Sequence, residues 1–537
     1  MVFALGASAF AADTTPVTTK AVDTTLSVTV DYTIEGLYFD GTTLKSSATN
    51  GYYPFNFSFI VSDRTAVGSI TVSNGGSFAW ASDSEDSETE STTTTYGLVT
   101  LPTTSASTVT VTSKSGGTLT ISCAQPNGGT TAAGTALYAY LPAPAQFVNE
   151  GVTTGGWGDA YDSNGAVKAT GSTGVSLGFF GGYAVYEFEN PIADDPTHPY
   201  GADFIVYGNA FWNNSEAGCI QVSKDGTTWY DIAGSMYYTK STKGATITYT
   251  NPNPNEDKGI TAAGATSTLA DVPYALTVNG TTTSGTVTKN TFHNHSWFPL
   301  NANYFVDSGT RKEMAKVDEF SFVSRTLNSD NITSTLTFKG TLLTNYPGTG
   351  KTDQIGFGYC DVHPNKTLGG TIAYNPYQTF TSSSDYDTKV AGTSGGDPID
   401  IAWAVNSSGA PVKLGSIKYV RIYTGMAQMN GIFGEISTEV CGVAACTGST
   451  TETAATPTIK VNGTTRETNN GQSAPVTNLG SGTCTVTVEG TGYIYINGVA
   501  TTSATFTPTR TGTSVQIIVQ NGTAAPYVAG LRLKTAG

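Results

Sequence analysis

Apolar and polar residues alternate in short runs along most of the chain. This period-two pattern is typical of half-buried antiparallel β-strands, because successive side chains of a strand point to opposite faces. In the first quarter of the chain the runs are residues 27–34, 55–61, 69–73, 108–112 and 118–122. No apolar pattern at helical spacing is long enough for an amphipathic helix of three turns. The pattern therefore predicts an all-β protein.

The densest group of strand-like runs lies between residues 180 and 234. We expect four strands there, at residues 183–188, 203–207, 219–223 and 229–232. An Asp225-Gly226 pair separates the last two runs and predicts a hairpin with a type I′ turn, in which both central residues have positive φ. The three prolines within residues 190–200 predict a stiff loop, because proline cannot continue a strand ladder.

Two segments rich in small or polar residues divide the chain. A glycine-rich linker covers residues 126–134, and a polar linker covers residues 447–456. They separate an N-terminal β-sandwich domain (24–125), a central module (137–446) and a small C-terminal domain (457–537). Strand-like runs with turn residues between them recur in the C-terminal segment, which is typical of an immunoglobulin-like sandwich. We expect both flanking domains to be of this immunoglobulin-like kind.

The composition narrows the possible partners. Only 12% of the residues are charged, and the formal net charge is −15. A nucleic-acid-binding surface needs clustered Lys and Arg to neutralise phosphates, so we expect no nucleic-acid partner. Anionic membrane surfaces are disfavoured for the same reason. An acidic chain of this kind suits a soluble exported protein, or one that binds divalent cations.

The first residues indicate export. Residues 1–11 form an apolar run that ends in Ala9-Phe10-Ala11, which fits the small-x-small rule of a signal peptidase site. The basic segment of a signal peptide is missing, so we expect Met1 to lie inside a longer signal peptide. No later run approaches the ~20 apolar residues of a transmembrane helix. We therefore expect a secreted or cell-surface protein without a transmembrane segment.

The chain contains six cysteines. In an exported protein these can form disulfides, and Cys441 and Cys446 are close enough in sequence to bridge across a turn. A Cys-x4-Cys pair could also be half of a metal site, but no second Cys or His pair lies nearby, so we expect no zinc. The other four cysteines suit small buried positions.

Eight motifs of the central module carry a resemblance to a known family. They are residues 146–151, 176–183, 187–192, 203–211, 222–230, 358–362, 395–401 and 418–421. In this order they resemble a domain of uncharacterised bacterial secreted and cell-surface proteins, which often stands beside immunoglobulin-like modules. The resemblance implies a jelly-roll sandwich of the discoidin-like, galactose-binding-like kind for the central module. The family offers no activity that the resemblance could carry over to this chain.

Acidic and amide side chains lie at the ends of the expected strands within these motifs. The candidate metal ligands are Asp203, Asn209, Asp361, Asp397 and Asp400. Calcium needs several oxygen ligands from carboxylates, amides and carbonyls, which loops at strand ends can supply. This pattern predicts a structural calcium ion that clamps the loops at one end of the sandwich. The alternative is that these acids cap turns and accept backbone hydrogen bonds.

Aromatic residues beside amides favour carbohydrate as a ligand. Sugars are bound by aromatic faces that stack on the ring C–H groups, while amides and carboxylates bind the hydroxyls. The candidate ligand-binding residues are Trp157, Trp212, Asn213, Asn214 and Trp297. The alternative is that the aromatic side chains belong to the core.

Together these observations predict an exported bacterial cell-surface protein. Its central β-sandwich would bind a carbohydrate (glycan) or, in its place, an extracellular protein, with calcium as a structural cofactor. One alternative is a structural surface-layer or fibre subunit without a small ligand. A glycoside hydrolase is the third, because two carboxylates suffice for it, with Glu150, Glu187 and Asp361 as candidates. No Gly-x-Ser-x-Gly motif appears with a plausible nucleophile elbow, and we expect no enzyme.

Overall fold

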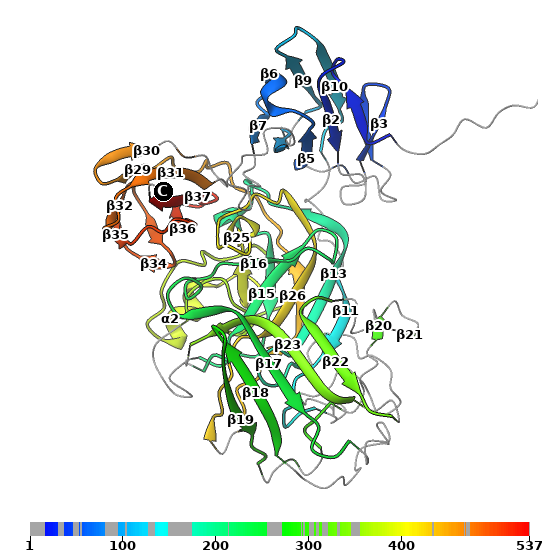
Figure 1. The fold of residues 1–537 in the computed structure, drawn as a ribbon, viewed down its shortest axis with the longest axis vertical. Helices are drawn as coiled ribbons and strands as arrows, with labels where there is room; N and C mark the ends of the chain where they lie inside the picture. Colours follow the sequence, from blue (N-terminus) through cyan, green and yellow to red (C-terminus); the bar gives the residue numbers. More distant parts are fainter. Residues whose placement is uncertain are drawn as a thin grey trace, which may run out of the picture. The chain divides into compact units, whose positions relative to one another are not determined.

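A computed structural model provides the fold. It describes residues 17–30, 37–46, 53, 56–80, 95–102, 105–126, 135–148, 174–212, 214–254, 271–290, 293, 296–299, 305–307, 311–313, 320–329, 333–344, 355–431, 434–466, 468 and 473–535. The chain forms two compact units, one of residues 1–80 and 87–127 and one of residues 81–86 and 128–537. Almost all regular structure is β-strand, so the protein is all-β, as predicted (Figure 1).

The N-terminal unit is a sandwich of two five-stranded sheets. One sheet has the order β1 (Thr19–Ala21), β2 (Ser27–Val30), β5 (Asn56–Val61), β8 (Thr95–Thr100), β7 (Ser77–Trp80). The other has the order β3 (Leu37–Asp40), β4 (Thr43–Ser46), β10 (Thr118–Cys123), β9 (Ser107–Ser113), β6 (Val67–Val72). Buried and partly exposed residues alternate along β9, and Val109 and Val111 lie in a core shared with Phe57 and Phe59 of the first sheet. This alternation is the sequence pattern that predicted the strands.

A six-stranded antiparallel sheet forms the middle of the second unit. Its order is β11 (Thr135–Leu141), β13 (Tyr183–Ala193), β26 (Ser416–Thr424), β15 (Gly218–Ser223), β16 (Tyr230–Ile232), β25 (Ala404–Val405). Both faces of its central strands are buried where consecutive residues are inaccessible to solvent, at residues 183–186 of β13 and 218–220 of β15. The central module is therefore built from three layers, with this sheet between two others.

A three-stranded sheet covers one face of the middle sheet, and a five-stranded sheet covers the other. The three-stranded sheet has the order β24 (Asp397–Ile399), β14 (Phe204–Tyr207), β28 (Gly442–Ala445), and Phe188 of β13 packs edge-on against its Phe204. The five-stranded sheet has the order β19 (Thr281–Val287), β18 (Val272–Val278), β17 (Ser241–Thr250), β23 (Thr333–Leu343), β22 (Val323–Leu327). Tyr183 of β13 packs against Phe338 of β23. Figure 1 shows β18, β17, β23 and β22 side by side.

Short elements complete this unit. They are β12 (Val175–Ser176), which pairs with β27 (Glu439–Val440), the hairpin of β20 (Phe305–Asp307) and β21 (Arg311–Glu313), helix α2 (Ser383–Lys389), and the 3-10 turns η2 (Pro199–Gly201) and η4 (Ile401–Trp403). A further 3-10 turn, η1 (Arg64–Ala66), lies in the N-terminal unit. In the described part of the chain, no helix is long and apolar enough to span a bilayer.

The C-terminal residues form a smaller sandwich within the same compact unit. Its sheets have the orders β30 (Thr464–Arg466), β29 (Thr458–Val461), β32 (Cys484–Glu489), β35 (Ser503–Phe506) and β31 (Ser473–Leu479), β37 (Tyr527–Thr535), β36 (Thr513–Gln520), β33 (Tyr493–Ile496), β34 (Val499–Ala500). Val486 and Ile517 belong to its own core. Ile518, on the opposite face of β36, packs into the core of the central module.

Three local predictions differ from the structure. Strand β13 runs through Pro191 to Ala193 and pairs with β26 there, so the start of the segment predicted as a stiff loop belongs to a strand. At the β15–β16 connection only Gly226 has a positive φ, so the turn is not type I′; the Asp225 carboxylate instead accepts the backbone N–H groups of Thr227 and Thr228 at 2.7 Å and stabilises a longer loop. Cys441 and Cys446 are both buried thiols on either side of β28. An extended strand rises about 3.3 Å per residue, which places them too far apart for a disulfide.

Candidate functional site

The acidic residues of the central module gather around the two ends of strand β14. This strand is fully buried between β24 and β28. Asp203 stands immediately before its first residue, and Gly208 and Asn209 follow its last. The candidate ligands therefore do not all lie at one end of the sandwich, because the acids form two separate clusters, and the calcium ion itself stays a prediction.

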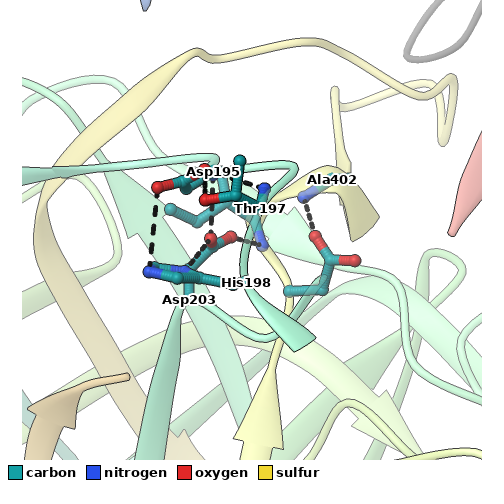
Figure 2. Close-up of polar contacts among 7 residues, drawn as sticks. Asp195, Thr197, His198, Asp203 and Ala402 are labelled. Atoms are coloured by element: carbon teal, nitrogen blue, oxygen red, sulfur yellow. Dashed lines mark hydrogen bonds and ion pairs between the residues drawn. The ribbon is translucent and has the colours of Figure 1, made fainter. Parts of the chain in front are cut away.

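The first cluster consists of Asp194, Asp203 and Asp400, whose carboxylate oxygens lie within 4.8 Å of one another. Pairing of β14 with β24 brings Asp203 and Asp400 together, since each flanks one of the two antiparallel strands. Asp203 is 1% exposed and accepts the backbone N–H groups of Asp195 at 3.0 Å and Ile401 at 2.9 Å. The Ala402 N–H donates to the Asp400 carboxylate at 2.7 Å, and Figure 2 labels Asp195, Asp203 and Ala402 in this arrangement.

Basic side chains lie close to this first cluster. The Nδ1 atom of His198 is 3.1 Å from Asp203 Oδ1, and its Nε2 is 3.9 Å from Asp195 Oδ2 (Figure 2). Burial raises the pKa of the Asp203 carboxyl to about 7, and the hydrogen bond from His198 opposes this rise. Burial also raises the pKa of Asp194, while the charge of Lys413 lowers it. The first cluster therefore has positive charge nearby within the protein.

The second cluster consists of Glu216, Asp361 and Glu439, again with carboxylate oxygens within 4.8 Å of one another. Backbone pairing brings the three together: the Glu216 N–H donates to the Asp361 carbonyl at 3.1 Å. The Asp361 carboxylate accepts the backbone N–H groups of Asn209 at 2.7 Å and Glu439 at 3.2 Å. A Cβ at position 208 would clash with this carboxylate, so the close approach requires Gly208.

The second cluster differs from the first in its electrostatics. Burial is the largest cause that raises the pKa of all three carboxyls, to about 7 for Asp361 and well above the ordinary value for Glu216 and Glu439. The next causes are neighbouring carboxylates and hydrogen-bond donors, and not a basic side chain. Among the described residues, none of the three forms an ion pair with Lys, Arg or His.

A fourth buried acid, Glu435, adds to this charge. It is 2% exposed; its Oε1 accepts the Gln146 N–H at 3.2 Å, and its Oε2 has no hydrogen-bond partner among the residues that the structure describes. Its charge raises the pKa of Glu216, and burial raises its own pKa to about 7. Several carboxyls are thus held near one another in a region of low dielectric constant.

The predicted metal ligands divide between these environments. Asp203 and Asp400 belong to the first cluster and Asp361 to the second, where Asn209 contributes its backbone N–H. Asp397 lies in neither: it is 2.8 Å from His363 Nδ1 and accepts the N–H groups of Val362 and His363. This is the turn-capping role that the sequence left open. The sequence reasoning missed three members, Asp194, Glu216 and Glu439.

The predicted ligand-binding residues are also separated. Trp157 and Asn213 lie outside the described residues. Trp297 is completely buried in the core and donates its indole N–H to the His293 carbonyl at 3.2 Å, so it is not part of a surface site. Trp212 and Asn214 are half-buried, and Trp212 packs against Tyr386 of α2 with ring centroids 6.1 Å apart. Its neighbour Phe211 is 71% exposed.

A pocket of about 530 Å³ lies beside α2. Its lining residues are Lys366, Thr367, Thr371, Asp387, Val390, Ala391, Gly392 and Thr393. Lys366 and Asp387 form an ion pair across it. None of these eight described residues is aromatic, so they offer no surface on which a sugar ring could stack.

The comparisons with known proteins assign no family. No protein-family model matches the chain, and no curated protein matches it. The fold and the two clusters define the class: an all-β protein of sandwich architecture with buried carboxylate groups in its central module.

Proposed function

We propose that this chain is an exported bacterial cell-surface protein whose central module binds carbohydrate, and that the cluster of Glu216, Asp361 and Glu439 holds a structural calcium ion. The observation that supports the calcium ion is the set of three adjacent carboxylates, two of them fully buried, without a basic side chain among their largest electrostatic influences. The first cluster is the weaker candidate because His198 and Lys413 lie near it.

The donor set fits calcium chemically. Calcium takes six to eight oxygen ligands, often from carboxylates and backbone carbonyls. Adjacent buried carboxylates repel one another when ionised, so they require protons or a cation. A bound divalent cation would supply the positive charge that, within the described residues, no ion pair with Lys, Arg or His brings to these three carboxyls.

The cluster is also placed to organise a loop. Asp361 begins the segment that continues to Lys366 and Thr371 of the pocket beside α2. Asn365 in this segment donates its side-chain amide to the Gly208 carbonyl, at the end of β14. An ion at the second cluster would therefore fix the start of a surface loop as well as neutralise buried charge.

Thermal unfolding of the full chain tests the calcium proposal. We expect the midpoint to rise when calcium replaces EDTA, and free calcium at 100 times its Kd would add about 2.7 kcal/mol. The double variant Glu216→Gln/Glu439→Gln should lose this response, while Glu489→Gln, on an exposed strand end, should keep it. A wild-type midpoint that is the same in EDTA and in calcium would overturn the calcium site.

A glycan array probed with the full chain tests the carbohydrate proposal. Binding to a defined set of glycans is expected, and absence of binding across the array would favour the structural-subunit alternative. The glycoside hydrolase receives no support from the candidates we named: Glu187 is ion-paired with Lys418 at 3.0 Å, Asp361 is buried, and Glu150 lies outside the described residues.

A further inference from the structure

The outer face of the five-stranded sheet carries ordered rows of hydroxyl groups. We call it the hydroxyl face; it is the side of β17, β18, β19, β22 and β23 opposite to the buried Ile247 and Phe338. One row crosses three strands through Ser324, Thr337 and Thr248, as the strand register shows. All three are exposed or half-exposed.

A second row repeats this arrangement one step along the strands. Thr246 pairs with Thr277, which pairs with Thr282. The hydroxyls of Thr277 and Thr282 are 2.8 Å apart, and those of Thr248 and Thr337 are 2.9 Å apart. Rows of this kind recur about every 6.7 Å along a strand, with about 4.8 Å between strands. The face therefore presents a regular array of groups that both donate and accept hydrogen bonds.

The charge of the hydroxyl face differs from that of the chain as a whole. The protein has 41 acidic and 26 basic residues, yet none of the five strands contains Asp or Glu. Lys339 is exposed on this face beside Thr246 and forms no ion pair within the described residues. An anionic partner is thus repelled by the overall charge of −15 but meets no carboxylate on these five strands.

We propose that the hydroxyl face binds an acidic polysaccharide, whose hydroxyls pair with the threonine rows and whose carboxylates are attracted to Lys339. This inference rests on the carbohydrate-binding function proposed above and names its surface and ligand class. Each hydroxyl contact gains little, because it replaces a hydrogen bond to water. A polymer gains from repetition along the rows. A flexible chain can also follow the right-handed twist of the sheet, which a flat crystalline surface cannot.

Retention on immobilised polygalacturonate, with dextran as the neutral comparison, tests this proposal. We expect the full wild-type chain to be retained on polygalacturonate more strongly than on dextran and to be released by salt. The double variant Thr248→Val/Thr337→Val keeps the branched side-chain shape and removes two hydroxyls, so its affinity should fall about tenfold. Lys339→Glu should reduce retention at least as much.

Matched controls separate the outcomes. Thr485→Val/Thr505→Val removes a cross-strand threonine pair in the C-terminal domain, and Lys114→Glu reverses an exposed charge in the N-terminal unit; both should be retained like wild type. If the hydroxyl-face variants are retained at the wild-type level, the inference is overturned while glycan binding stands. The same holds if retention is lost only in Phe211→Ser, which removes the exposed aromatic ring beside Trp212. A wild-type chain that binds glycans on the array but not polygalacturonate would also overturn it. A chain that binds no glycan at all would refute the proposed function itself.

Discussion

Replacing Arg421 should test whether the middle sheet depends on a buried cation. Arg421 of β26 is completely buried, and burial lowers the pKa of its guanidinium to about 10. Its Nη1 donates to Gln221 Oε1 at 2.7 Å, and its Nη2 donates to the Lys339 carbonyl at 3.2 Å. The guanidinium carbon is 3.6 Å from the centre of the Phe322 ring. It thus joins the middle sheet to the five-stranded sheet.

Arg421→Ala should lower the free energy of unfolding by about 4 kcal/mol. Each of the two acceptors left without a donor costs about 1–3 kcal/mol, and the cavity beside Phe322 adds to this loss. Arg421→Met fills much of the volume and should cost about 2 kcal/mol. The double variant Arg421→Met/Gln221→Leu should recover part of this loss, because it removes the Gln221 Oε1 acceptor together with the Arg421 donor and leaves no unsatisfied acceptor there.

Urea unfolding followed by tryptophan fluorescence and near-ultraviolet circular dichroism measures these differences. The order of stabilities should be wild type, then the double variant, then Arg421→Met, then Arg421→Ala. A loss below about 1 kcal/mol for Arg421→Ala would refute the reasoning, because it would mean that water or a rearranged side chain satisfies both acceptors.

Three further outcomes follow from the second cluster and the thiols. Gly208→Ala should cost about 2 kcal/mol in urea unfolding, because its Cβ would clash with the Asp361 carboxylate; wild-type stability would contradict the close approach. In EDTA, stability should fall as the pH rises from about 4 to 7, because burial raises the folded-state pKa of Asp361 and Glu435 to about 7, so the folded state holds the protons that the unfolded state releases. Calcium should remove this fall, since it favours the ionised carboxylates, and a pH profile unchanged by calcium would argue against the site. Thiol titration in denaturant without reductant should count six free cysteines, and a lower count would indicate a disulfide.

The strands were the part of the fold most accessible from the sequence. The alternation at residues 108–112 and 118–122 corresponds to β9 and β10. In a strand with one buried face, every second side chain is buried, and this alternation is visible in the sequence. The middle layer left no such signal. Both faces of β13 are buried over residues 183–186, which are all apolar or aromatic, so this part of the sequence does not reveal that two sheets cover it.

The candidate metal residues show where sequence reasoning stops. Asp203 and Asp400 were each recognisable as acids at strand ends, but only the antiparallel pairing of β14 with β24 places them together. Glu439 lies in β27, a strand of only two residues, which gives no periodic signal. Trp297 resembled an exposed aromatic beside polar residues, and its burial follows from packing between sheets that no local pattern encodes.

The pairing of the middle sheet also constrains how the chain folds during synthesis. Strand β26 lies between β13 and β15, although more than two hundred residues separate β13 from β26 in sequence. The centre of the sheet therefore cannot close until the ribosome has released residue 424, while the N-terminal unit is complete after residue 127. Such distant pairing slows folding, because the loop-closure entropy is lost before any contact compensates for it. The N-terminal unit can thus be folded before strand β26 of the central module has been synthesised.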